Sequence, residues 1–365
     1  MTRRRGDAAY DLDVEEGSFS YRPGGFHPVY VGDVFNRGKY LVLNKIGYGE
    51  NSTVWMVQDL SRSPRDALRY LALKVLAAGH QGDSIPERDI LVRLGTQPSV
   101  NPRVYDGGHQ HIRHLVDDFE HTGPNGTHVC LVFELMGETL ERFHLNFTPA
   151  NIPMPLMRKF TAQLVLALGW AHSLGITHAD IHPGHIFVKF QTPSRIAYGY
   201  LAEVRAPRQN RSERRYTPIR SSPLYNYYFN RFAPDGKYDF DICLGGWGHA
   251  ARNTDRRRRT MQPTPFQSPE VLIEAPWDKR TDWWSLGATL IEIHAQNRRL
   301  FHSVGETEED GRRNYLAQIE QLCGPFSQSL LSKGNPEIVK KMFDDAGQVA
   351  GAEQWEARPL RRGIL

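Results

Sequence analysis

Residues 177–185 have the sequence THADIHPGH, which is the most informative segment of the chain. They place the carboxylate of Asp180 in one short loop with the imidazoles of His182 and His185. The segment before this loop has an apolar residue at about every fourth position, at Leu156, Phe160, Leu164, Leu168 and Ala171. That spacing is typical of a long amphipathic helix, so we expect a helix that leads directly into the loop. Because carboxylates and imidazoles transfer protons and bind ions, the loop is the first candidate for a functional site.

The composition is that of an ordinary globular protein. Of the 365 residues, 40% are hydrophobic and 24% are charged. A chain of this length can form two hydrophobic cores, because single cores stop growing at roughly 250 to 300 residues. The formal net charge of +4 is too small to indicate nucleic-acid binding by itself.

The cysteines and the apolar runs bear on the compartment. Cys130, Cys243 and Cys323 lie far apart without C-x-x-C spacing, which indicates neither a disulfide framework nor a zinc site. No apolar run approaches the roughly 20 residues that span a bilayer, and the N-terminus lacks the apolar stretch of a signal peptide. We therefore expect a cytoplasmic and/or nuclear protein that does not act at a membrane.

Alternating apolar and β-branched residues predict that the first part of the chain is rich in strands. We expect strands over residues 40–49, 52–60, 70–77, 113–121 and 128–135, and a helix that begins near Pro86 and Glu87. Residues 191–237 are polar, rich in arginine and tyrosine, and without a clear period. We interpret them as an irregular basic insert, either a solvated linker or a docking segment.

The expected domain organisation has four parts. A flexible head covers residues 1–22, a strand-rich N-terminal lobe 23–137, a mainly helical C-terminal lobe 138–356 that contains the basic insert, and a tail 357–365.

Three motifs in the N-terminal lobe are typical of nucleotide binding. Gly47 and Gly49 fall in a strand-turn-strand, where backbone amides can cover phosphates. Lys74 on the third strand can reach the α- and β-phosphates, and Glu87 on the next helix can hold this lysine by an ion pair, with Asp89 as the alternative partner. Each feature alone has a structural explanation. Together with the loop at Asp180 and the triplet 268–270, SPE, they follow the order of motifs in protein kinases.

The chain resembles the SR-protein kinases, and especially the fungal members of that family. The resemblance covers most of residues 24–334 and rests on the runs GGFHPVYVGDVFN, IGYGENSTVW, HLVDDFEHTGPNGTHVCLVFELMG, HADIHP, LGGWG, SPEVLIEAPWDKRTDWWSLGATLIEI and GPFSQSLLSKG. It implies an α+β, bilobal protein-kinase fold with ATP and Mg²⁺ as cofactors. It also implies a monomer that transfers phosphate to serines of arginine/serine-rich splicing factors and so regulates mRNA splicing.

The resemblance also assigns roles to single residues. Asp180 would be the catalytic residue that accepts the proton of the substrate hydroxyl, and Asp282 would brace its loop. Phe133 would be the gatekeeper at the adenine, followed by the hinge. The full set of residues that would bind ATP is Ile46, Gly47, Gly49, Val54, Ala72, Lys74, Glu87, Phe133, Glu134, Met136 and Phe187.

The positions that would bind the metal depart from the family pattern. His185 stands in place of the asparagine, His182 in place of a lysine, and Gly246, in the triplet 246–248, in place of the aspartate of D-F-G. An alternative register through residues 243–245, CLG, also lacks a carboxylate. Mg²⁺ prefers oxygen ligands, whereas neutral imidazole suits zinc, copper or nickel. We therefore expect no residue to bind Mg²⁺ here and a phosphoryl transfer so impaired that the chain is a pseudokinase.

A transition-metal site at the histidines is the sharper alternative. His178, His182 and His185 lie close in sequence, but no cysteine or carboxylate completes the set at a sensible spacing. We interpret them as ordinary solvated loop histidines and predict no metal ligands.

A function of another class is a non-catalytic scaffold that binds splicing factors or RNA through basic surfaces. The run Arg256–Arg259 would contribute, although such runs are more often solvated or act in nuclear import. The acidic residues 306–310 fall where the family presents a docking surface, with a solvated loop as the alternative. The chain stops within what resembles the last lobe of the family, so we expect a truncated C-terminal lobe that lacks the arginine partner of Glu270.

Overall fold

The computed structural model describes residues 15–95, 107–147, 152–190, 193–212, 216–225, 227, 240–252, 264–295, 300–302, 305 and 307–351. They belong to two compact units. Unit 1 consists of Met1–Asp89, Arg113–Glu138 and Lys189–Gly236, and unit 2 of Ile90–Ile112, Thr139–Val188 and Lys237–Leu365. The predicted run Arg256–Arg259 and residue 306 of the acidic segment lie outside the described residues.

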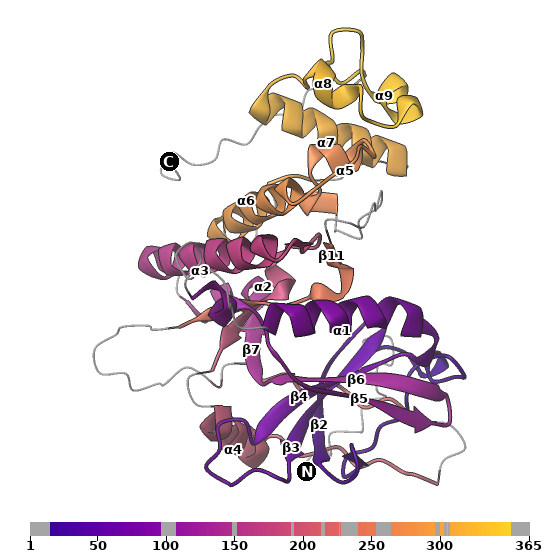
Figure 1. The fold of residues 1–365 in the computed structure, drawn as a ribbon, viewed down its shortest axis with the longest axis vertical. Coiled ribbons are helices and arrows are strands. Elements are labelled where there is room, and N and C mark those ends of the chain that lie inside the picture. The colour runs from indigo at the N-terminus through magenta and orange to yellow at the C-terminus, as the bar shows by residue number, and fades with distance from the viewer. Residues whose placement is uncertain are drawn as a thin grey trace, which may run out of the picture. The chain divides into compact units, whose positions relative to one another are not determined.

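Unit 1 is built on a six-stranded antiparallel sheet with the strand order β1-β2-β3-β4-β6-β5 (Figure 1). The strands are β1 Val34–Phe35, β2 Tyr40–Gly49, β3 Ser52–Asp59, β4 Tyr70–Leu76, β5 Leu115–Gly123 and β6 Gly126–Glu134. The five predicted strands are therefore present, within two residues at most ends. Helix α1, Gln81–Gly95, follows β4 and begins before the predicted proline start at Pro86.

Both faces of the central strands are buried, which explains why β3 and β4 read as nearly continuous apolar runs. Neighbouring residues of a strand point to opposite faces. Trp55 of β3 and Leu73 of β4 lie in one buried cluster, whereas Met56 and Ala72 lie in another. Each face needs its own cover, and strands buried on both sides lose the alternation of apolar and polar residues.

The basic insert supplies part of both covers, which differs from the predicted irregular excursion. Its first part forms helix α4, Pro193–Glu203, whose Tyr200 is fully buried on the face of Met56. The Tyr200 hydroxyl accepts a hydrogen bond from Asn44 Nδ2 at 3.0 Å and donates one to the Ser222 carbonyl at 2.6 Å. Ile219 of the same insert lies on the opposite face, in the cluster of Trp55. Because the insert is rich in arginine, these buried apolar residues were not recognised from the sequence.

The last residues of the predicted flexible head also pack against unit 1. Lys45 of β2 is fully buried and pairs with Glu15 at 2.9 Å and with Glu16. Its Nζ also donates to the carbonyl of Ile219 at 3.1 Å. Glu15 in turn accepts a hydrogen bond from the backbone of Ser221. One buried cation thus joins the N-terminal segment and the insert to β2.

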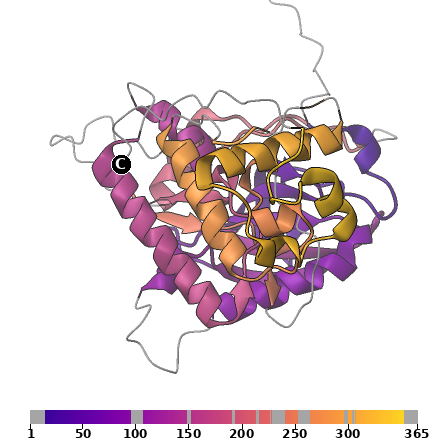
Figure 2. The same ribbon diagram turned by 90° about the horizontal axis from the view of Figure 1, so that it is seen from above.

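Unit 2 is mainly helical, as predicted. Its helices are α2 Leu140–Phe143, α3 Met154–Ser173, α5 Pro269–Leu272, α6 Arg280–His294, α7 Glu308–Cys323, α8 Gln328–Leu331 and α9 Pro336–Met342. Helix α3 is the predicted amphipathic helix before the Asp180 loop. Figure 1 labels α7, α8 and α9 together at one end of the helical unit, and Figure 2 shows the same helices from above. In this part of the unit Tyr315 and Phe326 share a buried core with Phe343. The acidic residues Glu308 and Glu309 form the first turn of α7, where negative charge suits the helix dipole, and not a loop.

Short strands frame the Asp180 loop. They are β7 Met136–Thr139, β8 Ile176–Thr177, β9 Ile186–Lys189, β10 Ile242–Leu244 and β11 Ala251–Arg252. Strands β9 and β10 pair antiparallel, with Phe187 opposite Cys243, and β8 pairs with β11. The loop is therefore anchored by a strand at each end. No helix among the described residues is long and apolar enough to cross a membrane.

Candidate functional site: a nucleotide-binding strand set and the Asp180 loop

The predicted ion pair of Lys74 and Glu87 is present in unit 1. Lys74 Nζ on β4 donates to both carboxylate oxygens of Glu87 on α1, at 2.8 and 2.9 Å. Val54 on β3 lies opposite Lys74 in the strand register, and Gly47 on β2 lies opposite Val54. The glycine turn, the lysine and the glutamate thus come from adjacent elements, which is the arrangement needed to hold the phosphates of a nucleotide.

The remaining predicted ATP residues of unit 1 lie on the same strands. Ala72 on β4 is opposite Phe133 on β6. Phe133 is buried, and the guanidinium of Arg113 lies 4.4 Å from its ring centre. Glu134 ends β6 and Met136 begins β7, so the predicted hinge joins these two strands. The last predicted ATP residue, Phe187, lies on β9, in unit 2.

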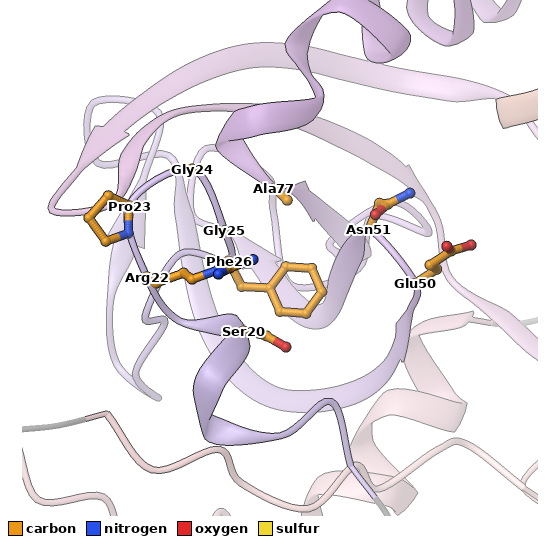
Figure 3. A pocket seen from close by; sticks show the side chains of 9 residues that line it. All are labelled: Ser20, Arg22, Pro23, Gly24, Gly25, Phe26, Glu50, Asn51 and Ala77. Carbon is orange, nitrogen blue, oxygen red and sulfur yellow. The ribbon is translucent and has the colours of Figure 1, made fainter.

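A hollow of about 310 Å³ lies beside the turn between β2 and β3 (Figure 3). It is lined by Glu50 and Asn51 of the turn, by Ala77, and by the N-terminal segment from Ser20 to Phe26. The ring of Phe26 points into it. None of the predicted ATP-binding residues lines this hollow, so it is distinct from the nucleotide set.

Asp282 of α6 anchors the start of the Asp180 loop through hydrogen bonds to its backbone. Its two carboxylate oxygens accept hydrogen bonds from the backbone amides of His178 and Ala179, each at 2.8 Å. His172 Nε2 of α3 lies 2.7 Å from the same carboxylate. Ala179 has a φ of 60°, in the left-handed region, which costs a residue with a side chain about 1 to 2 kcal/mol. The fully buried Asp282 therefore fixes a strained turn, as the resemblance implied.

His178 is fully buried and neutral. Its Nε2 bonds to the carbonyl of Gly245 at 2.8 Å, and its Nδ1 accepts from the amide of Asp180 at 3.2 Å. These partners assign the proton to Nε2. Burial, together with the nearby His185, lowers the pKa of His178 to about 3. The ring is thus a structural link between the loop and the backbone after β10.

Asp180 is surrounded by three further histidines. His185 Nδ1 lies 3.5 Å from Oδ2, while His182 Nε2 and His249 Nε2 lie 4.0 Å from Oδ1 and Oδ2 respectively. We call Asp180, His182, His185 and His249 the Asp180 cluster. The side chain of Asp180 is 5% exposed, and those of His182 and His185 are 22% and 26% exposed. The cluster is therefore half-buried and not a solvated loop.

One expectation about this loop is wrong. A carboxylate does lie within reach of the histidines, and it is the predicted catalytic residue Asp180 itself. The absence of metal ligands stays a prediction. His249 was not among the predicted site residues. It comes from the short turn Trp247–His249 after β10, and its position directly after the triplet 246–248 is the sequence signal that could have identified it.

Burial sets the proton affinities in the cluster. Asp180 is 4% exposed, and desolvation raises the pKa of its carboxyl to about 7. The same desolvation, with the nearby His185 and His249, lowers the pKa of His182 to about 3. A proton near neutral pH is therefore held more readily by the carboxyl of Asp180 than by the ring of His182.

His185 and Gly246 are in direct contact. A Cβ on Gly246 would lie 2.3 Å from Cγ of His185 and 2.4 Å from its Nδ1, closer than real atoms approach. Gly246 also has a φ of 74°. Of the two possible triplets, 246–248 brings its first residue against His185, whereas Cys243 and Leu244 at the start of 243–245 pair with β9.

Asp241, the carboxylate just before β10, is engaged elsewhere. It forms an ion pair with Lys159 Nζ at 2.9 Å and accepts a hydrogen bond from Gln163, both on α3. Its side chain is 51% exposed. It therefore does not replace the missing carboxylate at position 246.

Comparisons with known proteins find relatives among the protein kinases. No family model matches the chain. A serine/threonine protein kinase of Aspergillus fumigatus is 29% identical over 347 residues, which cover 95% of this chain and 79% of the relative. The serine/threonine-protein kinase SRPK of Physarum polycephalum is 26% identical over 357 residues, 92% of this chain and 78% of the relative. Protein kinase dsk1 of Schizosaccharomyces pombe is 37% identical over 272 residues, 72% of this chain and 45% of the relative.

The likeness extends to solved structures. A crystal structure of a kinase domain matches 90% of this chain and 83% of its own with a TM-score of 0.64, at 20% identity. That identity shows the fold alone, and the fold is the expected bilobal, α+β one. The relatives, rather than this structure, support an SRPK-like serine/threonine protein kinase family for the chain.

Proposed function

We propose that this chain is an SRPK-like kinase domain that binds ATP and transfers phosphate poorly or not at all with Mg²⁺. The observation that carries the proposal is the contact of His185 with Gly246, the two positions that the family pattern gives to metal ligands. The Lys74–Glu87 ion pair supports the retention of the nucleotide. In this proposal the ATP-binding half of the machinery is intact and the metal-binding half is not.

The residues at the two positions do not fit Mg²⁺. His185 offers imidazole nitrogen, which is a poor ligand for a hard cation that prefers oxygen. Gly246 offers no side chain, and the ring of His185 fills the space in which a carboxylate would start. The nearest further carboxylate along this segment, Asp241, is paired with α3. These residues therefore do not form a Mg²⁺ site.

The groups that remain can supply only part of the chemistry. Lys74 would position the α- and β-phosphates, and Asp180 would accept the proton of a serine hydroxyl. With its pKa raised to about 7, Asp180 is in its basic form in only part of the molecules at neutral pH. Loss of the metal and of the lysine replaced by His182 removes several kcal/mol of transition-state stabilisation, and each ~1.4 kcal/mol is a tenfold change in rate.

We infer the substrate, the compartment and the oligomeric state from the family. One relative, 35% identical over 182 residues, is SRSF protein kinase 3 of Homo sapiens. By this relationship the segment presented to the site would be an arginine/serine-rich tail of a splicing factor. A monomer in the cytoplasm or nucleus is the corresponding expectation. The role as a non-catalytic scaffold for splicing factors or RNA remains the alternative of another class.

Isothermal titration calorimetry with ATP tests the proposal. We expect ATP to bind with nearly the same affinity with and without Mg²⁺, and Lys74→Met to abolish the signal. A lack of any ATP signal for the unaltered chain would exclude the nucleotide-binding domain and leave the scaffold. A strong increase of affinity with Mg²⁺ would show that oxygen ligands for the ion exist, against the proposal.

A further inference from the structure

We propose that the Asp180 cluster is a binding site for a divalent transition-metal ion of the zinc class, with Asp180, His182, His185 and His249 as ligands. The inference concerns the bare protein and does not depend on nucleotide binding.

The first observation is the convergence of donor atoms. One donor atom from each of Asp180, His182 and His185 lies within 4.8 Å of the other two. Donors on a tetrahedral ion with bonds of about 2.0 to 2.1 Å lie roughly 3.3 Å apart. The distance of 3.5 Å from His185 Nδ1 to Asp180 Oδ2 is already close to this value, and that of 4.0 Å from His182 Nε2 to Oδ1 needs a small contraction. His249 Nε2 lies 4.0 Å from Oδ2 but is not one of the three converging donors, so it would have to move further to become the fourth ligand.

The second, independent observation is an unsatisfied carboxylate oxygen. Asp180 is 4% exposed, and its Oδ1 has no hydrogen-bond partner. A buried polar atom without a partner costs free energy, so most such atoms in native proteins are satisfied by protein, water or an ion. His182 Nε2 lies 4.0 Å from Oδ1, too far for a hydrogen bond. An ion between them would satisfy both atoms.

The chemistry of the donors selects the class of ion. Imidazole nitrogens combined with one carboxylate suit Zn²⁺, Co²⁺ or Ni²⁺, whereas Mg²⁺ needs an oxygen shell. His182 Nδ1 accepts a hydrogen bond from the amide of Gly184, so this ring carries a lone pair. A neutral ring offers a lone pair, which is the form that binds metal ions.

Ligation requires a local exchange of hydrogen bonds. His182 Nδ1 accepts a long hydrogen bond of 3.2 Å from the amide of Gly184, and His185 Nδ1 lies 2.9 Å from the carbonyl of Asp180. Binding through His182 Nε2 would move its proton to Nδ1 and give up the bond from Gly184. Binding through His185 Nδ1 would give up the bond to the carbonyl, unless the ring turns to present Nε2. The site is therefore adaptable and not fully preformed.

Occupation of the site would change what the loop can do. The ion would take the oxygens of Asp180 that a general base needs, so the same residue could not accept a proton from a hydroxyl. In the family pattern the metal joins positions 185 and 246. Here the ion would instead join residues 185 and 249. The ion would therefore lock the Asp180 loop to the turn Trp247–His249 and keep the domain from phosphoryl transfer.

The experiment uses the untagged full chain after treatment with a chelator, since an affinity tag of histidines would bind the same ions. Co²⁺ is added and its visible ligand-field absorption is followed, with Zn²⁺ and Mg²⁺ as competitors. We expect one Co²⁺ per chain, displacement by Zn²⁺, and no displacement by Mg²⁺. Replacement of His182, His185 or His249 by glutamine should weaken binding by at least about 10- to 100-fold.

The variants carry their own controls. His294→Gln removes an imidazole at the end of α6 outside the cluster and should bind Co²⁺ as the unaltered chain does. His249 is 41% exposed, so His249→Gln keeps the fold and tests the ligand even if the more buried variants unfold. Unchanged affinity in His249→Gln and His182→Gln, or no uptake of Co²⁺ by the unaltered chain, would overturn the proposal.

Discussion

The imidazole of His185 fills the space that a side chain on Gly246 would occupy, with Cγ only 2.3 Å from the position of a Cβ. The two departures from the family pattern are therefore one structural feature. Restoring the family residue at only one of the two positions would place it against the altered residue at the other. An aspartate at 246 would collide with His185, and an asparagine at 185 would face a glycine without a carboxylate.

The first prediction concerns this pair. Gly246→Asp alone should destabilise unit 2 by about 1 to 3 kcal/mol, because it adds both a clash and a residue with φ above zero. The double variant with His185→Asn removes the ring and should recover most of the clash component while creating an oxygen set for Mg²⁺. Thermal denaturation with and without Mg²⁺ measures both effects. Equal stability of the two variants would contradict the contact.

The second prediction concerns the ion pair in unit 1. Glu87→Gln leaves Lys74 with a neutral partner and should weaken ATP binding by roughly tenfold, since each ~1.4 kcal/mol is a factor of ten. Lys74→Met should weaken it further. Asp89→Asn is the matched control and should leave ATP binding unchanged, because both hydrogen bonds of Lys74 Nζ that the structure records go to Glu87. Calorimetry provides the measurement.

The third prediction concerns the buried lysine of β2. Glu16→Gln should destabilise the chain by about 1 to 3 kcal/mol, because it weakens one of the two ion pairs of a fully buried cation while Glu15 remains. Combining it with Lys45→Met removes the charge and should recover much of the loss. Denaturant unfolding measures both. A double variant that is no more stable than Glu16→Gln would show that the ion pairs of the buried Lys45 do not stabilise the fold.

The fourth prediction is an acid sensitivity of unit 1. The rings of His27, His121 and His128 lie together, with centres 4.6 and 5.0 Å from His27, and Asp33 is the nearby acid. Burial first, and then the two other histidines, lower the pKa of His27 to about 3. The folded state therefore binds fewer protons than the unfolded state between pH 6.5 and 3, so its stability is full above pH 6.5 and falls below it.

For His27 alone this loss is about 1.4 kcal/mol between pH 8 and 5.5. His27→Phe should flatten the fall of the melting temperature over that range, whatever its effect at pH 8. His294→Gln, outside the trio, should keep the slope of the unaltered chain. An unchanged slope in His27→Phe would show that His27 is not what acid titrates. Asp180 acts in the opposite sense, because its raised pKa favours the protonated folded state, and it is present equally in all three proteins.

The sequence predicted the elements that depend on local patterns. The strands β2 to β6, helix α3 and the Lys74–Glu87 pair could be predicted because periodicity and motif spacing act over short distances. The insert was interpreted differently from its structure because its anchors, Tyr200 and Ile219, contact strands that lie far away in the sequence.

The Asp180 cluster was missed for a related reason. Spacing along the chain suggested that no cysteine or carboxylate completes the histidines. The fold brings His249 back to it from the turn after β10, a distance that no sequence window covers. The contact of His185 with Gly246 likewise exists only in three dimensions.

In the proposed function, the contact between His185 and Gly246 disables Mg²⁺-dependent transfer while Asp180 is kept. Transfer of radiolabelled phosphate from ATP to an arginine-serine peptide, with Mg²⁺, tests it most directly in the unaltered chain, in Asp180→Asn, and in the double variant His185→Asn with Gly246→Asp. We predict that the unaltered chain is close to the background set by Asp180→Asn and that the double variant exceeds it. Robust transfer by the unaltered chain that Asp180→Asn abolishes would contradict the account.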